Sequence, residues 1–159
     1  MATNLRPLGE HSETNMTDMS SKKLSLIVSE WNDQITGSMM LAARETLLEQ
    51  GAKEENILIK YVPGSFELTL AAQWEAQQQD IDAVICIGCV IQGETKHFDF
   101  ICHAVAEGLT NVSLKYDKPV VFGVLTPNTM QQALDRAGGK HGNKGEEAAI
   151  TAIKMLGFH

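Results

Sequence analysis

Hydrophobic residues along the chain follow two patterns, short continuous runs and longer stretches with apolar positions three or four residues apart. The continuous runs predict buried β-strands over residues 23–28, 56–62, 80–88 and 119–125. The helical spacing predicts helices over about 33–50, 66–78 and 130–137, one with its apolar face from Phe98 to Leu109, and a last one holding Ala148 to Leu156. Four strand-then-helix units indicate an α/β fold with a parallel sheet, helices on both faces and right-handed crossovers.

The same pattern makes local predictions. The second helix carries Leu68, Leu70, Ala71 and Trp74 as candidate packing residues, and Asn32 or Asp33 can cap the first helix. Residues 138–145 hold four glycines and are expected to form a loop.

One stretch, residues 83–99, holds the strongest indication of a functional site. An apolar run with β-branched residues passes through Gly93 into polar residues and enters an amphipathic helix. This pattern is typical of a buried strand that delivers a loop to a helix N-terminus, where free N–H groups and the helix dipole favour a phosphate. His97 falls in the first helical turn, where a proton carrier would be useful. Glu94 stands where a nucleotide-binding phosphate loop requires Lys, which argues against a nucleoside triphosphatase.

The other strands also end in polar or aromatic residues, at Trp31-Asn32, at 64–67 and at 125–127. Parallel strands end at one edge of a sheet, so these loops are expected to form a single site. Trp31 and Phe66 are each expected in the core if judged singly, and Glu67 would then only complement a helix dipole.

Composition limits the functions that the chain can have. The chain has 159 residues, a length for one domain, and its net charge of −7 disfavours nonspecific binding to nucleic acid or an anionic membrane. Arg136, Lys140, His141 and Lys144 still form a local basic cluster, either a solvated face or an anion site. Residues 1–22 are polar and aperiodic and are expected to be a flexible tail, with the domain over 23–159.

The three cysteines bear on compartment and chemistry. An odd count without a signal peptide favours a reducing cytoplasm. Cys86 and Cys89 form a C-x-x-C, but an offset of three in a strand puts them on opposite faces, so a shared metal or disulfide is disfavoured. No apolar run is long enough to span a bilayer.

Five segments together resemble the lumazine synthase family of riboflavin biosynthesis. They are 31–36 (WNDQIT), 62–67 (VPGSFE), 90–99 (VIQGETKHFD), 122–126 (FGVLT) and 136–145 (RAGGKHGNKG), in the family's order and spacing. The resemblance implies a flavodoxin-like three-layer α/β/α sandwich with a four-stranded parallel sheet. The implied reaction condenses 5-amino-6-(D-ribitylamino)uracil with 3,4-dihydroxy-2-butanone 4-phosphate to 6,7-dimethyl-8-ribityllumazine, with release of phosphate and water. No metal or organic cofactor is required in the family.

The resemblance also implies residue roles. His97 matches the proposed general acid/base. The uracil ring is assigned to Trp31, to backbone of Cys89, Val90 and Ile91, and to Lys144 near a carbonyl. The ribityl chain is assigned to Ser65, Phe66 and Glu67, with Asn32 nearby, and the phosphate to Glu94, Thr95 and Arg136. Phe122 and Arg136 are expected to come from an adjacent subunit. The chain departs from the common family pattern at Gln92 and Glu146.

Family members form pentamers, and many bacterial ones assemble twelve pentamers into an icosahedral capsid. The turn at 138–145 has no inserted segment, so a pentamer at minimum and a sixty-subunit shell are expected, with riboflavin synthase as a candidate partner. Two alternatives stay open: a flavodoxin-like binding or receiver module without catalysis, and a lumazine-binding homologue that has lost turnover. The module does not explain Trp31, His97 and Arg136, whereas the homologue needs a product assay to be distinguished.

Overall fold

A computed structural model describes residues 17–158. Of the tail expected over residues 1–22, residues 1–16 lie outside the described residues. The sheet contains β1 (Leu24–Ser29), β2 (Ile57–Val62), β3 (Ala83–Cys89) and β4 (Val120–Leu125). These strands are all parallel and lie in the order β2-β1-β3-β4. The predicted parallel α/β fold is therefore confirmed, with each strand within a few residues of its predicted position.

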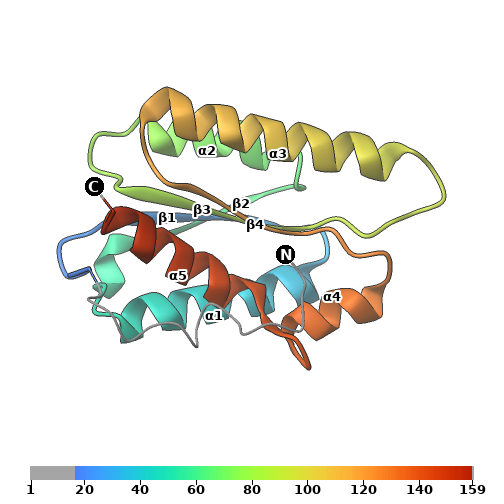
Figure 1. Cartoon of the computed structure of the whole chain (residues 1–159), viewed down its shortest axis with the longest axis horizontal. Coiled ribbons are helices and arrows are strands. Elements are labelled where there is room, and N and C mark those ends of the chain that lie inside the picture. Colours follow the sequence, from blue (N-terminus) through green and yellow to red (C-terminus); the bar gives the residue numbers. More distant parts are fainter. Residues whose placement is uncertain (1–16, 159) are drawn as a thin grey trace.

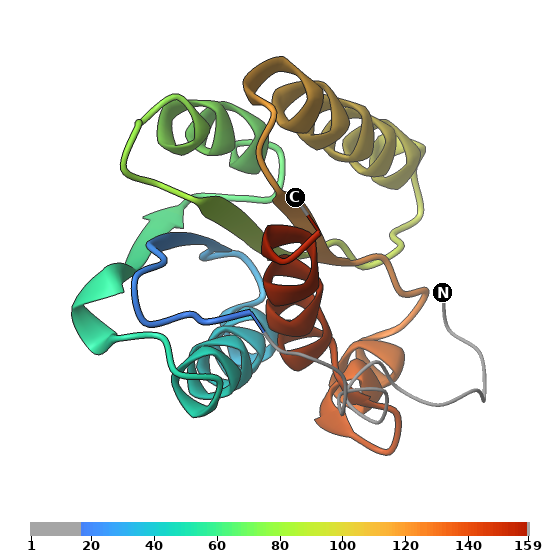
Figure 2. The same cartoon turned by 60° about the vertical axis from the view of Figure 1, so that its left-hand side comes forward.

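Helices cover both faces of this sheet. α1 (Asp33–Glu49), α4 (Met130–Arg136) and α5 (Lys144–Leu156) lie on one side, and α2 (Leu68–Ala76) and α3 (His97–Tyr116) lie on the other (Figure 1). Figure 2, turned by 60°, shows the same three layers. A short 3-10 turn, η2 (Glu54–Asn56), precedes β2. The arrangement is the three-layer flavodoxin-like sandwich that the resemblance implied.

The two central strands, β1 and β3, are buried along their whole length. Their side chains divide between two cores, because successive residues of a strand point to opposite faces. Leu26, Ile85 and Cys89 pack on the α1 and α5 side, whereas Ile27 and Cys86 pack on the α2 and α3 side. The prediction that Cys86 and Cys89 face opposite ways is confirmed. Burial of the predicted strands is confirmed for β1 and β3, whereas the edge strands β2 and β4 are buried only in part.

The packing predicted for α2 is wrong in part. Leu68 is fully buried, but Leu70 and Trp74 are 50% and 54% exposed. The helix presents Leu68, Ala72 and other residues four positions apart to the sheet, so a residue two positions from Leu68 points to the opposite side. Glu75 is buried instead.

The loop expected over 138–145 contains two short antiparallel strands, β5 (Ala137–Gly139) and β6 (Gly142–Asn143). Gly138 and Gly142 have positive φ angles of 106° and 77°, which glycine adopts without strain and which let the chain reverse. The hairpin brings the end of α4 next to the start of α5.

The described residues before β1 lie against the body of the domain. Met19 is fully buried in the core on the α1 and α5 side. The hydroxyl of Thr17 donates to the carbonyl of Ile153 in α5 at 3.3 Å. Residues 17–22 thus contribute to the packing around α5.

Candidate functional site

The carboxyl ends of the four strands meet at one edge of the sheet, as the parallel topology requires. Backbone bonds tie the loops there to one another. The amide of Trp31 donates to Pro63 at 3.2 Å, and the amide of Gln92 donates to Pro127 at 2.9 Å. The loops after β1 and β2 are therefore joined to each other, as are those after β3 and β4. The prediction that these loops lie at one edge of the sheet is confirmed.

Asn32 connects the first pair to β3. Its side-chain amide donates to the carbonyl of Cys89 at 2.9 Å. Asn32 is the N-cap residue of α1, but it has a left-handed φ of 61° and makes no side-chain cap bond. The predicted capping by Asn32 is therefore wrong in mechanism: its amide crosses to the end of β3 instead, which fixes the loop that carries Trp31.

Two aromatic side chains are exposed to solvent at this edge of the sheet. Trp31 is 72% exposed and Phe66 is 56% exposed. The core location favoured for each residue when judged singly is wrong, because each follows the end of a strand, beyond the layer that packs against the helices. An exposed ring at a polar strand end can stack on a planar ligand.

Ser65, the residue before Phe66, is buried, and its hydroxyl has no hydrogen-bond partner in the described residues. A Cβ added at Gly88 would lie 2.6 Å from that hydroxyl oxygen. The absence of a side chain at Gly88 thus leaves room for Ser65 against β3. Glu67, the N-cap residue of α2, is exposed at the same edge.

The loop 93–96 leads into α3, which begins at His97. Glu94, Thr95 and His97 are all exposed, and the amide of His97 donates to the Thr95 hydroxyl oxygen at 3.4 Å. The first-turn N–H groups of a long helix point toward this loop, so it can accept an anion beside an accessible imidazole. Cys89, Val90 and Ile91 form the end of β3 and the start of the segment that leads to it.

A second group lies at the hairpin between α4 and α5. Nη2 of Arg136 donates to Glu147 at 2.8 Å, and Nζ of Lys144 lies 3.3 Å from the same carboxylate oxygen. Arg136 also donates through Nη1 to the carbonyl of His141. Lys140 pairs with Asp135. The predicted basic cluster therefore exists, but three of its cations are already paired with carboxylates.

Glu147 was not predicted from the sequence. Burial of its carboxyl group opposes ionisation, but the hydrogen bond from Arg136 and the charge of Lys144 outweigh burial and lower its pKa. The only sequence signal was an acidic residue three positions after Lys144, a common spacing on any helix.

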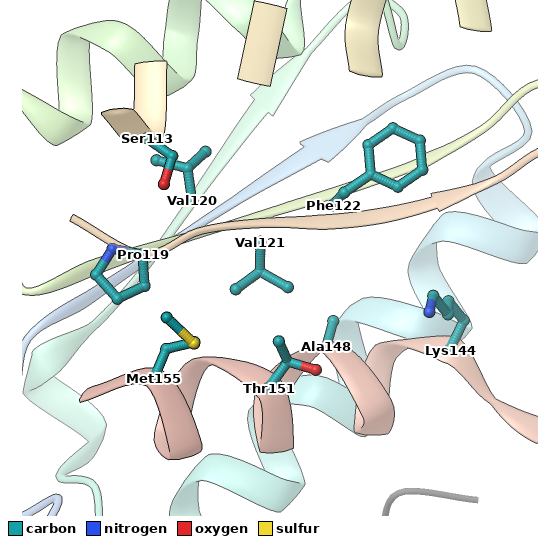
Figure 3. Close-up of a pocket in the computed structure, with 9 residues that line it drawn as sticks. All are labelled: Ser113, Pro119, Val120, Val121, Phe122, Lys144, Ala148, Thr151 and Met155. Carbon is teal, nitrogen blue, oxygen red and sulfur yellow. The ribbon is translucent and has the colours of Figure 1, made fainter. Parts of the chain in front are cut away.

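Phe122 and Lys144 line a groove of about 320 Å³ between β4 and α5 (Figure 3). Phe122 lies on the edge strand, and Lys144 begins α5 across from it at the same end of the groove. The remaining lining residues are Ser113, Pro119, Val120, Val121, Ala148, Thr151 and Met155. The groove is open along an unpaired strand edge, a surface that another chain can cover.

The predicted site residues thus fall into two groups. The strand-end group comprises Trp31, Asn32, Ser65, Phe66, Glu67, Cys89, Val90, Ile91, Glu94, Thr95 and His97, and the groove group comprises Phe122, Arg136 and Lys144. Among residues 17–158, no hydrogen bond or ion pair of the Arg136 or Lys144 side chain reaches the strand-end group.

Other chemistries find little support in the described part of the chain. Burial raises the pKa of the Cys86 thiol, and it raises the pKa of Cys89 to about 11. Within residues 17–158 no three His, Cys, Asp or Glu residues gather as metal ligands. None of the helices described there is both long and apolar enough to cross a membrane.

Comparison with known proteins identifies the family. The family described as 6,7-dimethyl-8-ribityllumazine synthase matches residues 21–159. The 6,7-dimethyl-8-ribityllumazine synthase of Cytophaga hutchinsonii is 59% identical over 139 residues, covering 87% of each chain. Those of Parabacteroides distasonis and Bacteroides fragilis are 49% and 57% identical; the first alignment covers 99% of each chain, and the second covers 86% of this chain and 95% of its relative. The chain belongs to the 6,7-dimethyl-8-ribityllumazine synthase family.

Proposed function

We propose that this chain catalyses the reaction for which its family is named. It condenses 5-amino-6-(D-ribitylamino)uracil with 3,4-dihydroxy-2-butanone 4-phosphate to form 6,7-dimethyl-8-ribityllumazine, a step of riboflavin biosynthesis. The observation that carries this conclusion is the family match over residues 21–159, with relatives of that name aligned along nearly their whole length. The chain is therefore a transferase that acts on a planar pyrimidine and a phosphate ester.

The strand-end group supplies the place for the pyrimidine. The exposed rings of Trp31 and Phe66 offer stacking surfaces, and the end of β3 at Cys89, Val90 and Ile91 offers backbone N–H and C=O groups to the uracil edge. Exposed Glu67 can accept bonds from the ribityl hydroxyls, beside Ser65 and Asn32.

The start of α3 supplies the place for the phosphate. Glu94 and Thr95 present the loop amides and a hydroxyl, and the helix dipole favours the negative charge. His97, exposed at the first position of α3, directly follows this loop and serves as the general acid/base. Arg136 binds the phosphate from a neighbouring subunit, together with Lys144 and Phe122 near the ring.

The chemistry accounts for these groups. The substrate amine attacks the ketone and, with loss of water, forms an imine. Phosphate then leaves to give an enol, the enol tautomerises to a ketone, and the second nitrogen attacks that ketone and closes the ring with loss of a second water. These steps need proton transfers near neutral pH and stabilisation of the departing phosphate. The protein supplies no nucleophile of its own, so much of the rate comes from holding the two reactants together.

We propose further that the sites lie between subunits of a pentamer, with twelve pentamers in a sixty-subunit shell. Support comes from the groove at the edge strand β4, which Phe122 and Lys144 line. It also comes from Arg136, whose side-chain bonds within residues 17–158 go to His141 and Glu147 and not to the strand-end group. Riboflavin synthase, which consumes the product, is a candidate partner. Three free cysteines, two of them buried in the core, suit the reducing cytoplasm in which we place the protein.

The test is detection of 6,7-dimethyl-8-ribityllumazine by its fluorescence after purified protein is mixed with both substrates. Arg136→Ala should lose activity strongly at low butanone phosphate and less at saturation, because the phosphate contact is removed. Arg44→Ala is the matched control, since Arg44 also pairs with a carboxylate, that of Glu54, but away from both groups of site residues. It should behave as wild type.

Wild-type product above the spontaneous rate, with the loss confined to Arg136→Ala, supports both the reaction and the phosphate site. No product above that rate would contradict the reaction and favour a binding homologue that has lost turnover. Light scattering tests the assembly separately: a species of pentamer mass at every concentration would exclude the shell.

A further inference from the structure

One carboxylate holds the two cations assigned to substrate. The same oxygen of Glu147 accepts from Nη2 of Arg136 at 2.8 Å and lies 3.3 Å from Nζ of Lys144. The three side chains are largely shielded from solvent, with exposed fractions of 14% for Glu147, 18% for Arg136 and 23% for Lys144. Shielding makes such interactions stronger than those of a freely solvated surface pair.

This contact fixes the guanidinium of Arg136. Two acceptors hold it, Glu147 at Nη2 and the carbonyl of His141 at Nη1. A guanidinium carries five N–H donors, so others remain for a phosphate while the plane of the group is already set. Preset donors favour catalysis because no reorientation is needed as phosphate leaves.

The contact also changes the net charge of the phosphate site proposed around Arg136 and Lys144. Arg136 and Lys144 together carry two positive charges. Without the carboxylate of Glu147 between them, these two cations would repel each other. With Glu147 ionised, the three side chains carry one net positive charge. A phosphate is then bound less tightly than by the two cations alone, which favours its release after elimination.

We propose that Glu147 is a positioning residue for the phosphate site: it holds Arg136 and Lys144 in place and offsets one of their two charges. The proposal rests on the proposed function in taking the anion to be a phosphate ester and inorganic phosphate. Glu147 is not assigned any contact with substrate.

The competing explanation is that Glu147 only complements the dipole of α5. Its neighbour Glu146 separates the two explanations. Glu146 lies in the same first turn of α5, carries the same charge and is exposed, and it forms no ion pair among the described residues. Glu146→Gln therefore reproduces the change in net charge and in the helix dipole interaction without touching Arg136.

The experiment compares Glu147→Gln, Glu147→Ala and Glu146→Gln in the assembled protein. Binding of inorganic phosphate is measured by calorimetry, and kcat and KM for butanone phosphate are measured by product fluorescence. Glu147→Gln keeps an oxygen that accepts from Arg136 but removes the charge. It should bind phosphate about tenfold more tightly than Glu146→Gln, the order expected for one charge a few ångströms away at an intermediate dielectric.

Glu147→Ala also removes the support for Arg136. Its kcat should fall by about tenfold or more, because a misplaced catalytic group costs rate even at saturation. The kcat of Glu147→Gln should stay within about threefold of wild type, since the amide rescues the geometry.

Equal phosphate affinity in Glu147→Gln and Glu146→Gln would overturn the charge role, and wild-type kcat in folded Glu147→Ala would overturn the positioning role. If Glu147→Ala fails to fold by circular dichroism, phosphate binding by Glu147→Gln decides. Failure of the wild type to make product would contradict the proposed function alone, because phosphate binding is measured without turnover.

Discussion

The close packing of α5 against α1 depends on Gly145. A Cβ added at Gly145 would lie 2.5 Å from the carbonyl carbon of Met39 and 2.8 Å from its Cα, and closer still to its carbonyl oxygen. These are backbone atoms of α1, so no side chain can rotate away. Gly145 is also held by a bond from its amide to the side chain of Asn143 at 2.8 Å. Gly145→Ala must therefore push the start of α5 away from α1.

The size of the effect follows from two opposing terms. Carbon atoms in contact lie about 3.5–4.0 Å apart, so α5 must move by at least roughly 1 Å, and overpacking of this kind costs about 1–3 kcal/mol. Alanine gains up to about 1 kcal/mol over glycine in a helix. With an overpacking cost near the upper value, the net loss in the free energy of unfolding is about 2 kcal/mol. For a chain of this length, that loss lowers the thermal midpoint by about 4–8 °C.

Gly37→Ala is the matched control, because Gly37 lies in α1 and an added Cβ there has no atom within 4 Å. It should raise the midpoint slightly, as glycine within a helix is less stable than alanine by about 0.5–1 kcal/mol. Calorimetry at one fixed protein concentration gives both midpoints. An unchanged or higher midpoint for Gly145→Ala would refute the argument that glycine sets the distance between α1 and α5.

Other expectations concern the site and the core. His97→Ala should slow product formation by about a hundredfold without abolishing it, since proximity of the substrates supplies the remaining rate; complete loss in a folded protein that still binds substrate would contradict that division. Cys86 and Cys89 should resist iodoacetamide at pH 8 in the native protein and react in denaturant, as counted by mass spectrometry, because burial raises both thiol pKa values. The pKa of Glu147 is lowered from 4.5, so its ion pairs stabilise the protein above about that pH and are lost as pH falls through the lowered value. The difference in thermal midpoint between wild type and Glu147→Gln should therefore shrink as pH drops below about 4.5, and a difference that stays constant would contradict this assignment.

The fold could be predicted because its strongest signals are local. β1 and β3 are short, mostly apolar runs rich in β-branched residues, a pattern typical of strands buried on both faces. The opposite burial of Cys86 and Cys89 followed from strand geometry alone. The exposure of Trp74 could not be predicted from the sequence. α2 has apolar residues on more than one face, and the sequence does not show which of these faces packs against the sheet.

The grouping of candidate site residues could be predicted only where these residues are close together in the sequence. Residues 93–97 join a loop and a helix start within a few positions, so their grouping needed no tertiary knowledge. The exposure of Trp31 and Phe66 required the ends of two strands to be located. The pairing of Arg136 with Glu147 joins residues from two helices, and it depends on the hairpin of β5 and β6 that the sequence suggested only as a loop.

The division of the site residues into two groups has a consequence for mixed assemblies. If each site combines the strand-end group of one subunit with the groove group of its neighbour, neither His97→Ala nor Arg136→Ala chains alone can form a complete site. In a randomly mixed equal assembly, half of the chains supply His97 and half of the neighbours supply Arg136, so about one half times one half, or one quarter, of the sites are complete. Assayed at low butanone phosphate, where both single variants lose most of their activity, co-refolded mixtures should therefore show about a quarter of wild-type activity, well above either variant. Activity equal to the mean of the two separate variants would mean that each chain builds its own site.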